Sequence, residues 1–332
     1  MKKIIWFLLI VTGIQVGTFS YYNHLLGGGA NGPDAAAVSY KIGGSNGDPV
    51  KLFDGQTDQV ALSDSKNLVA YVDEQNTLHV QDITNNKEVY TLSNEGKIDY
   101  ITWIQDNGLL LGISKGKGSN KKLIVKTAML STNNVRTIRT IGPVSSTSTF
   151  KKMTFSPFTN DIYILVGNKN ISKLYHVGTS GDFKMENVSS YYVDNILMAS
   201  TKNELFFEDV KQRIPYLHSR DEKGTHRIEK NAVALRAIND TLYYGKLDAA
   251  GNVTSVYTYE QGTSNKIIDL NQPVKPDRLL VKEDGTLIRV EDAKYVDLKT
   301  NKETTIAGEG QASVKNNVLF KSSPSGTTLI NL

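Results

Sequence analysis

Histidines are the residues of this chain most able to bind a metal ion or to transfer a proton, and the sequence scatters them. They are His24, His79, His176, His218 and His226. No two stand at the spacing that metal ligands take within one strand. His218 and His226 flank one predicted hairpin together with Asp221 and Glu222, so a metal site is one interpretation of that hairpin. We favour the other interpretation, exposed turn residues, and predict no metal.

Catalytic chemistry by other residues finds little support. The chain has no cysteine, which excludes thiolate nucleophiles, disulfides, Cys-ligated zinc, iron–sulfur clusters and a lipid-modified cysteine. A serine nucleophile needs a sharp strand-to-helix turn, and the sequence favours almost no helix. Adjacent carboxylates occur near predicted strand ends, where solvated charges are common; they are Glu208-Asp209, Glu283-Asp284 and Glu291-Asp292. We therefore predict no catalytic residue and no cofactor.

Basic and aromatic residues in the longer predicted loops favour binding instead. Residues 115–122 form the most cationic loop, with Lys115, Lys117, Lys121 and Lys122. A Ser/Thr-rich insertion follows at 142–151, and another loop carries Tyr191 and Tyr192. Together they would form a shallow platform for an anionic or sugar-bearing surface polymer, or for a protein partner. The alternatives are a solvated hairpin tip for the lysines and a core position for one of the two tyrosines.

The net charge of the whole chain argues against nucleic acid as the partner. Its 38 Lys and Arg residues exceed its 34 Asp and Glu residues by only +4. A nucleic-acid binder neutralises many phosphates and needs a larger basic excess. We therefore predict no nucleic-acid binding.

Seven similar hairpins are predicted to position these loops. In each, a polar pair that tolerates a tight turn precedes an apolar, mostly β-branched or aromatic run that suits a buried strand. The pairs are Lys66-Asn67, Asp106-Asn107, Thr159-Asn160, Lys202-Asn203, Asn239-Asp240, Asp284-Gly285 and Asn316-Asn317. Successive pairs are separated by 32 to 53 residues. A spacing near 40 residues is typical of a β-propeller with one four-stranded blade per interval.

The sequence thus predicts an all-β, seven-bladed β-propeller, with six-bladed or eight-bladed rings as alternatives. Residues 312–314, 318–320 and 327–330 would supply three strands of the last blade, and residues 49–53 its outer strand. Pairing the two chain ends in one blade leaves no free inner edge. Residues 38–42 compete with 327–330 for the third strand of this blade, and we favour the C-terminal segment.

Two of the turns resemble a known family. Residues 64–71 and 155–163 are similar to the recurring "SPDGKxIAF" turn of TolB-type and WD40-like propellers, and of the propeller half of the prolyl-oligopeptidase and dipeptidyl-peptidase IV group. The pattern extends over about residues 38–332, although the Gly-His and Trp-Asp signatures of WD40 repeats are missing and no hydrolase domain is expected. The resemblance implies a protein that binds partner proteins in the cell envelope. It carries over no functional residue.

The N-terminal segment predicts a location outside the cytoplasm. Lys2 and Lys3 precede an apolar stretch, and residues 4–22 as a helix would be about 28 Å long, close to the thickness of a bilayer core. Residues 1–22 are therefore a signal anchor or a signal peptide cleaved near 18–20, and we favour the anchor. Residues 23–37, rich in Gly and Ala, would form a flexible linker to a propeller at 38–332.

These features lead to one functional hypothesis and one alternative. We expect a membrane-tethered or secreted extracytoplasmic β-propeller that acts as a non-enzymatic protein- or polymer-binding scaffold at the cell envelope. The alternative is an envelope enzyme, a glycan or peptide hydrolase or lyase, with its site at the central channel.

Overall fold

The computed structural model describes residues 49–53, 57, 59–93, 95–104, 106–188, 192–307, 310–315 and 317–330. The predicted leader and linker (1–37) and the segment 38–42 lie outside these residues. In the described part of the chain, no helix has the length and apolar character needed to span a membrane.

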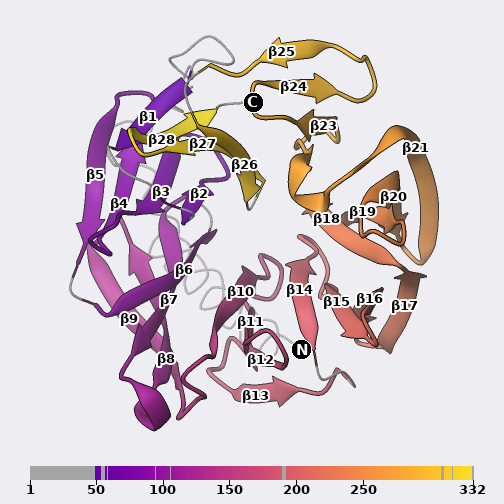
Figure 1. Ribbon diagram of the computed structural model, residues 1–332. Coiled ribbons are helices and arrows are strands. Elements are labelled where there is room, and N and C mark those ends of the chain that lie inside the picture. The colour runs from indigo at the N-terminus through magenta and orange to yellow at the C-terminus, as the bar shows by residue number, and fades with distance from the viewer. Residues whose placement is uncertain are drawn as a thin grey trace, which may run out of the picture. The chain divides into compact units, whose positions relative to one another are not determined.

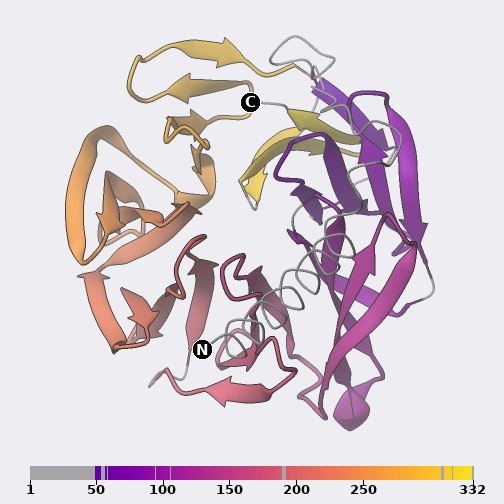
Figure 2. The ribbon, with the colours of Figure 1, turned by 180° about the vertical axis from the view of Figure 1, so that it is seen from behind.

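The described residues form four-stranded antiparallel sheets arranged as the blades of a ring (Figures 1 and 2). Blade 1 contains β2 (Val60–Leu62), β3 (Leu68–Val72), β4 (Leu78–Asp82) and β5 (Lys87–Leu92). Blade 2 contains β6 (Lys97–Ile104), β7 (Gly108–Lys115), β8 (Lys122–Met129) and β9 (Asn134–Ile141). Blade 3 contains β10 (Thr149–Phe155), β11 (Ile162–Gly167), β12 (Ser172–Val177) and β13 (Phe183–Glu186). Blade 4 contains β14 (Val193–Met198), β15 (Leu205–Lys211), β16 (Ile214–Asp221) and β17 (Gly224–Lys230).

The remaining blades follow the same order, from inner strand a to outer strand d. Blade 5 contains β18 (Ala232–Ile238), β19 (Thr241–Leu247), β20 (Val253–Glu260) and β21 (Thr263–Val274). Blade 6 contains β22 (Leu279–Val281), β23 (Leu287–Val290), β24 (Lys294–Asp297) and β25 (Glu303–Thr305). Short 3₁₀ turns, η1 (Gly118–Asn120) and η2 (Pro276–Arg278), lie in two of the connections.

Blade 7 closes the ring by joining strands from the two ends of the described chain. Its strands are β26 (Gln311–Lys315), β27 (Val318–Ser323), β28 (Gly326–Ile330) and, as the outer strand, β1 (Pro49–Phe53). β1 runs antiparallel to β28, with Val50 opposite Leu329. The prediction of seven blades, and of β28 rather than residues 38–42 as the third strand, is therefore confirmed.

The predicted tight turns between strands a and b are present in most blades. Lys66, Asn160, Asn239 and Asn317 adopt positive φ angles between 52° and 60°, and Gly285 has φ 80°. Asn and Gly adopt this left-handed conformation at little cost, which explains the recurring polar pairs.

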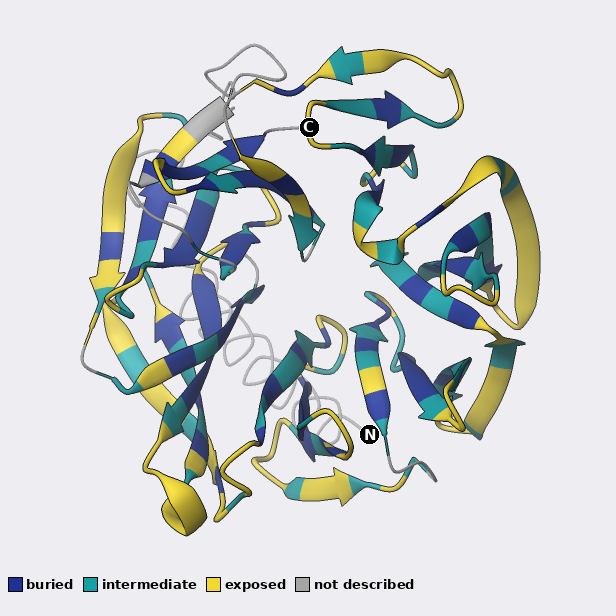
Figure 3. Cartoon of the chain, in the orientation of Figure 1, coloured by how far each residue is buried: buried dark blue, intermediate teal, exposed yellow. Residues whose placement is uncertain are grey.

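The apolar core is divided among the interfaces between neighbouring blades. Each of seven clusters of buried side chains draws on two adjacent blades, and the last one joins blade 7 to blade 1. Strand β7 shows the reason: Leu109 and Leu111 pack toward blade 1, whereas Leu110 packs toward blade 3. Successive side chains of a strand point to opposite faces, so a fully apolar strand b serves two interfaces. Figure 3 shows the buried inner strands and the exposed outer strands β5, β9 and β21.

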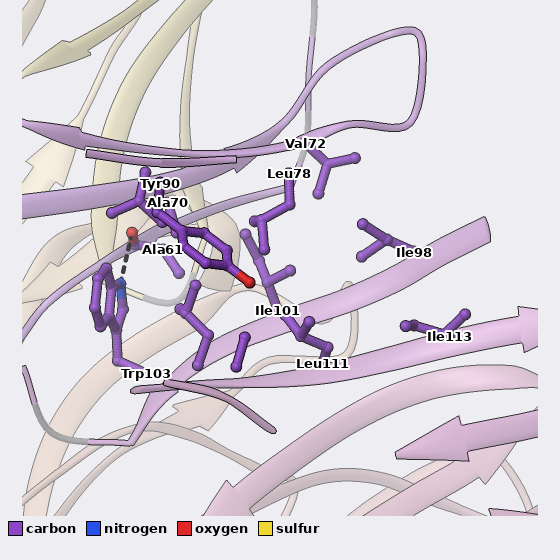
Figure 4. Close-up of a cluster of buried hydrophobic side chains, with 13 residues drawn as sticks. Ala61, Ala70, Val72, Leu78, Tyr90, Ile98, Ile101, Trp103, Leu111 and Ile113 are labelled. Atoms are coloured by element: carbon purple, nitrogen blue, oxygen red, sulfur yellow. Dashed lines mark hydrogen bonds between the residues drawn. The ribbon is translucent and has the colours of Figure 1, made fainter. Parts of the chain in front are cut away.

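The interface between blades 1 and 2 illustrates this packing (Figure 4). Leu78, Ile101 and Leu111 are almost completely buried there. The indole Nε1 of Trp103 in β6 donates a hydrogen bond to the Ala61 carbonyl oxygen in β2 at 3.0 Å. This bond satisfies the one polar atom of the indole and links the inner strands of two blades.

We expect Leu111→Ala to lower the free energy of unfolding by about 2–5 kcal/mol, because it removes buried methyl groups and leaves a cavity between two blades. Urea denaturation would measure the change. Val89 is exposed in β5, so Val89→Ala is the control and should change the value by less than about 0.5 kcal/mol. Equal effects of the two substitutions would contradict the placement of the core between blades.

The ring closure can be tested by truncation. A chain that begins at Pro49 retains β1, whereas one that begins at Thr57 lacks it and loses Leu52 from the cluster between blades 7 and 1. We expect only the shorter chain to have a lower melting temperature and to aggregate, because removal of β1 exposes the edge of β28. Identical melting curves for the two chains would show that β1 does not close the ring.

Candidate functional site

The loops that join strand b to strand c, and strand d to the next blade, share one face of the ring, which we call the loop face. Three of its loops belong to blades 2 and 3: residues 116–121, 142–148 and 168–171. The sequence-predicted lysines occupy the first of these loops and its flanking strand ends. The candidate site is therefore the loop face of these two blades.

Hydrogen bonds join the three loops. The Val144 backbone N–H donates to the Lys121 carbonyl oxygen at 3.0 Å, and the Lys121 amino group donates to the Ser146 carbonyl oxygen at 3.2 Å. The side-chain amide of Asn168 donates to the Thr147 hydroxyl oxygen at 3.1 Å. Since each loop is fastened to its neighbour, the three present one continuous surface.

The predicted lysines are available for binding. Lys115, Lys117 and Lys122 are exposed, and Lys121 is half-buried. Two further exposed lysines of blade 3, Lys169 and Lys173, were missed because they stand singly in the sequence. In the part of the chain that the structure describes, none of these six lysines forms an ion pair. We call them the loop-face lysines.

The tyrosine pair has a different environment. Tyr191 lies outside the described residues, so only Tyr192 can be placed. The amino nitrogen of Lys151 lies 4.0 Å from the centre of the Tyr192 ring, 2.8 Å from its hydroxyl and 2.8 Å from the Asp194 carboxylate. Tyr192 is thus engaged with a cation of its own chain. A cavity of about 600 Å³ adjoins this group, and Thr147 and Asn168 also line it.

A larger cavity, of about 1170 Å³, opens where the loop face meets the ring axis. Carboxylates from several connections line it, namely Asp73, Glu74, Asp99 and Asp277. Asp73 accepts from the Thr77 backbone N–H and lies 3.0 Å from His79, and Asp99 accepts from Ser114. Among the described residues, no group of three or more His, Asp and Glu side chains could hold a metal ion.

Three histidines occupy a repeated setting within the blades. His79, His176 and His218 lie in strand c, and each stacks on an aromatic ring of strand b: Tyr71, Tyr163 and Phe207 respectively. Each also has a ring nitrogen 3.0–3.1 Å from an aspartate. This setting combines ring stacking with a contact to a carboxylate, so these histidines belong to the packing of their blades.

The expectation that His218 is an exposed turn residue is wrong. Its side chain is 13% exposed, and Nε2 lies 3.0 Å from the Asp209 carboxylate. Burial lowers the pKa of His218 and favours the neutral ring, although Asp209 opposes this effect. Burial alone would also lower the pKa of His79, but hydrogen bonds to Glu88 and Asp73 raise it above its ordinary value. His226 is exposed, as expected.

A polar chain crosses blades 3, 4 and 5 near their inner strands. The Lys152 amino group donates to the Asn195 side-chain oxygen at 2.9 Å, and the Asn195 amide donates to Glu208 Oε1 at 2.8 Å. The same Glu208 oxygen accepts from the Ala234 backbone N–H at 2.9 Å. Glu208 is 4% exposed. Burial raises its pKa to about 7, and burial lowers the pKa of Lys152 to about 8.

The raised pKa of Glu208 makes a testable contribution to stability. Because the folded-state pKa lies above the ordinary value of 4.5, the folded state holds the proton more tightly, and this contribution is lost as pH rises from 4.5 through about 7. Glu208→Gln keeps both hydrogen bonds to Oε1 and does not ionise. We expect urea denaturation to show that the variant gains stability relative to the wild type between pH 5 and pH 8. A stability difference that does not change with pH would contradict the assignment.

Comparison with known proteins adds evidence on the fold alone. No protein-family model and no curated protein matches the sequence. Among solved structures, the chain is similar to the β-propeller domain of Cps50 (Swd1) from Myceliophteria thermophila, with a TM-score of 0.61 over 86% of this chain and 100% of that chain. The sequence identity is 10%, so this likeness establishes a shared fold and no shared activity. The chain thus has the fold of a seven-bladed β-propeller, and its resemblance to TolB-type and WD40-like propellers in sequence stays a prediction.

Proposed function

We propose that this protein is a non-enzymatic binding scaffold whose loop face over blades 2 and 3 binds an anionic or sugar-bearing polymer or a protein at the cell envelope. The observation that carries the proposal is the group of six loop-face lysines, which lie on the hydrogen-bonded loops or at the strand ends beside them and form no ion pair within the described residues. Cations without an internal ion pair can pair with an anionic partner at little cost in lost intramolecular salt bridges.

The distribution of charge along the chain supports an anionic partner. Residues 97–152 contain ten Lys and Arg residues but only two Asp and no Glu, whereas the whole chain has 38 basic and 34 acidic residues. Blade 2 and its connection to blade 3 are therefore strongly basic, and the rest of the chain has an acidic excess. Such an asymmetry orients an anionic partner toward one sector of the ring.

The proposed location of the scaffold rests on the N-terminal sequence. An apolar segment at residues 4–22 that follows Lys2 and Lys3 would hold the propeller outside the cytoplasm, as a membrane anchor or, after cleavage, as a secreted protein. The Gly-rich segment 23–37 would then be the tether.

The alternative, an envelope enzyme that acts at the ring axis, has weaker support. Asp73 and Asp99 line the axial cavity, but each already accepts hydrogen bonds from its own chain. A general acid or base must be able to reach the substrate.

Neutralisation of Lys115, Lys117, Lys121 and Lys122 to Gln should weaken capture of the protein's partner from an envelope extract by about tenfold, because the partner's anionic groups lose their counter-charges. The control neutralises the same number of lysines on the opposite face: Lys87, Lys223, Lys299 and Lys302, all exposed in turns or strand ends between strands c and d. Quantitative capture at two salt concentrations would measure the effect. Undiminished capture by the first variant, or an equal loss in both, would remove the loop-face lysines from the binding site.

A further inference from the structure

A cleft between the outer halves of blades 2 and 3 combines apolar, aromatic and basic side chains. The proposed binding by the loop-face lysines does not account for this combination. Its cavity of about 500 Å³ lies beneath the loop 142–148. β9 of blade 2 forms one wall, and β12 and β13 of blade 3 form the other. We call it the blade 2–3 cleft.

The floor of this cleft is apolar and aromatic. Tyr175 and Phe183 stack with ring centres 5.2 Å apart, and Ile141 and Val166 line the same cavity. Pairing of β12 with β13 places Tyr175 opposite Met185, so both side chains lie on the face that looks toward blade 2.

The mouth of the cleft carries exposed apolar side chains. Met185 is 60% exposed and Ile171 is 46% exposed. These two are among the six exposed large hydrophobic residues of the described chain, and both flank one cavity. Exposed apolar groups gathered beside an aromatic pocket are a feature of protein-binding surfaces.

The rim of the cleft is basic. The Arg139 guanidinium carbon lies 4.5 Å from the centre of the Phe183 ring. Pairing of β8 with β9 places Arg139 opposite Val125 and Arg136 opposite Thr127, so both arginines lie on the face toward blade 3. Lys173 lines the cavity from the other side. Within the described residues, none of these three cations forms an ion pair.

The carboxylate nearest along β13 does not neutralise this rim. Glu186 lies on the other face of the strand, where it contacts Lys184 at 3.0 Å and Arg220 of blade 4 at 2.8 Å. The cleft therefore combines an apolar floor with uncompensated positive charge at its edge.

We propose that the blade 2–3 cleft binds an extended segment of a partner protein in which apolar side chains alternate with acidic ones. Apolar side chains of the segment contact Tyr175, Phe183 and Met185, and its carboxylates pair with Arg136 and Arg139. Arginine binds carboxylates through two parallel hydrogen bonds, and buried aromatic and arginine contacts dominate the energy of interfaces. A wholly hydrophilic polyanion would leave the apolar floor unused. This inference rests on the proposed scaffold function. It gives the scaffold a second binding surface and a protein as the partner of that surface.

The test uses the full chain and a fluorescein-labelled ten-residue peptide of alternating Glu and Leu. We expect fluorescence anisotropy to show saturable binding that is weakened at least tenfold when the Leu residues are replaced by Ser, or the Glu residues by Lys. The double variant Arg136→Glu and Arg139→Glu should weaken binding at least tenfold, and Met185→Glu at least fivefold. The control, Lys87→Glu with Lys223→Glu, makes the same number of charge reversals on the face opposite the loops and should leave binding unchanged.

Two outcomes would overturn the proposal. If the Glu–Ser peptide binds as tightly as the Glu–Leu peptide, the surface attracts polyanions in general; if no peptide binds, the cleft is not a peptide site. A failure of this proposal can be told apart from a failure of the scaffold proposal. The variant in which Lys115, Lys117, Lys121 and Lys122 are replaced by Gln should still bind the peptide but should lose capture of the partner from the envelope extract. Met185 and the two arginines are exposed, so their variants should fold, and unchanged far-ultraviolet circular dichroism and melting temperature would verify this.

Discussion

Apolar contact between neighbouring blades is the interaction on which the rest of this structure depends. A four-stranded sheet cannot shield both of its own faces, and here each blade covers the faces of the two beside it. The requirement is circular: the first and last blades need each other. The pairing of β1 with β28, and the cluster that joins blades 7 and 1, meet this requirement without a disulfide in a chain that has no cysteine.

Polar side chains inside the ring also make contacts between neighbouring blades. Two polar contacts show how a partner on a neighbouring blade satisfies a side chain that enters an interface between blades. Trp103 bonds to Ala61, and the chain from Lys152 through Asn195 to Glu208 ends on the Ala234 backbone of blade 5. A buried polar group without a partner would cost more than such a bond contributes, so these contacts fix which blade faces which.

Loops on a β-propeller can vary without disturbing the contacts between blades. In this chain the candidate binding features are concentrated on blades 2 and 3. Three hydrogen-bonded loops, the loop-face lysines and the blade 2–3 cleft all occur in that sector. The cleft lies between β9 of blade 2 and strands β12 and β13 of blade 3, in the outer halves of the two blades. Basic residues of β9 then meet aromatic residues of β12 and β13, which come from different blades.

The sequence by itself determined the blades, their number and the order of their strands, because each hairpin is specified locally. A turn residue that tolerates positive φ and a strand with period-two burial both act over fewer than about ten residues. The loop with Lys115, Lys117, Lys121 and Lys122 was identified for the same reason: its lysines are neighbours in the chain. The closing strand was also recognised, since a ring leaves only one place for the spare outer strand.

Only the tertiary structure decided which residues meet across blades. His218 was misjudged because the partner that buries it, Phe207, is supplied by the adjacent strand and is set by the pairing of β15 with β16. From the sequence, Glu208 was predicted to be one of several solvated carboxylates. In the structure it is buried against blade 5, and this burial raises its pKa to about 7. Arg139 and Phe183 are separated by more than forty residues, and the distance between them depends on how two sheets pack. Side chains on different blades share no local pattern, and the packing of the blades alone brings them together.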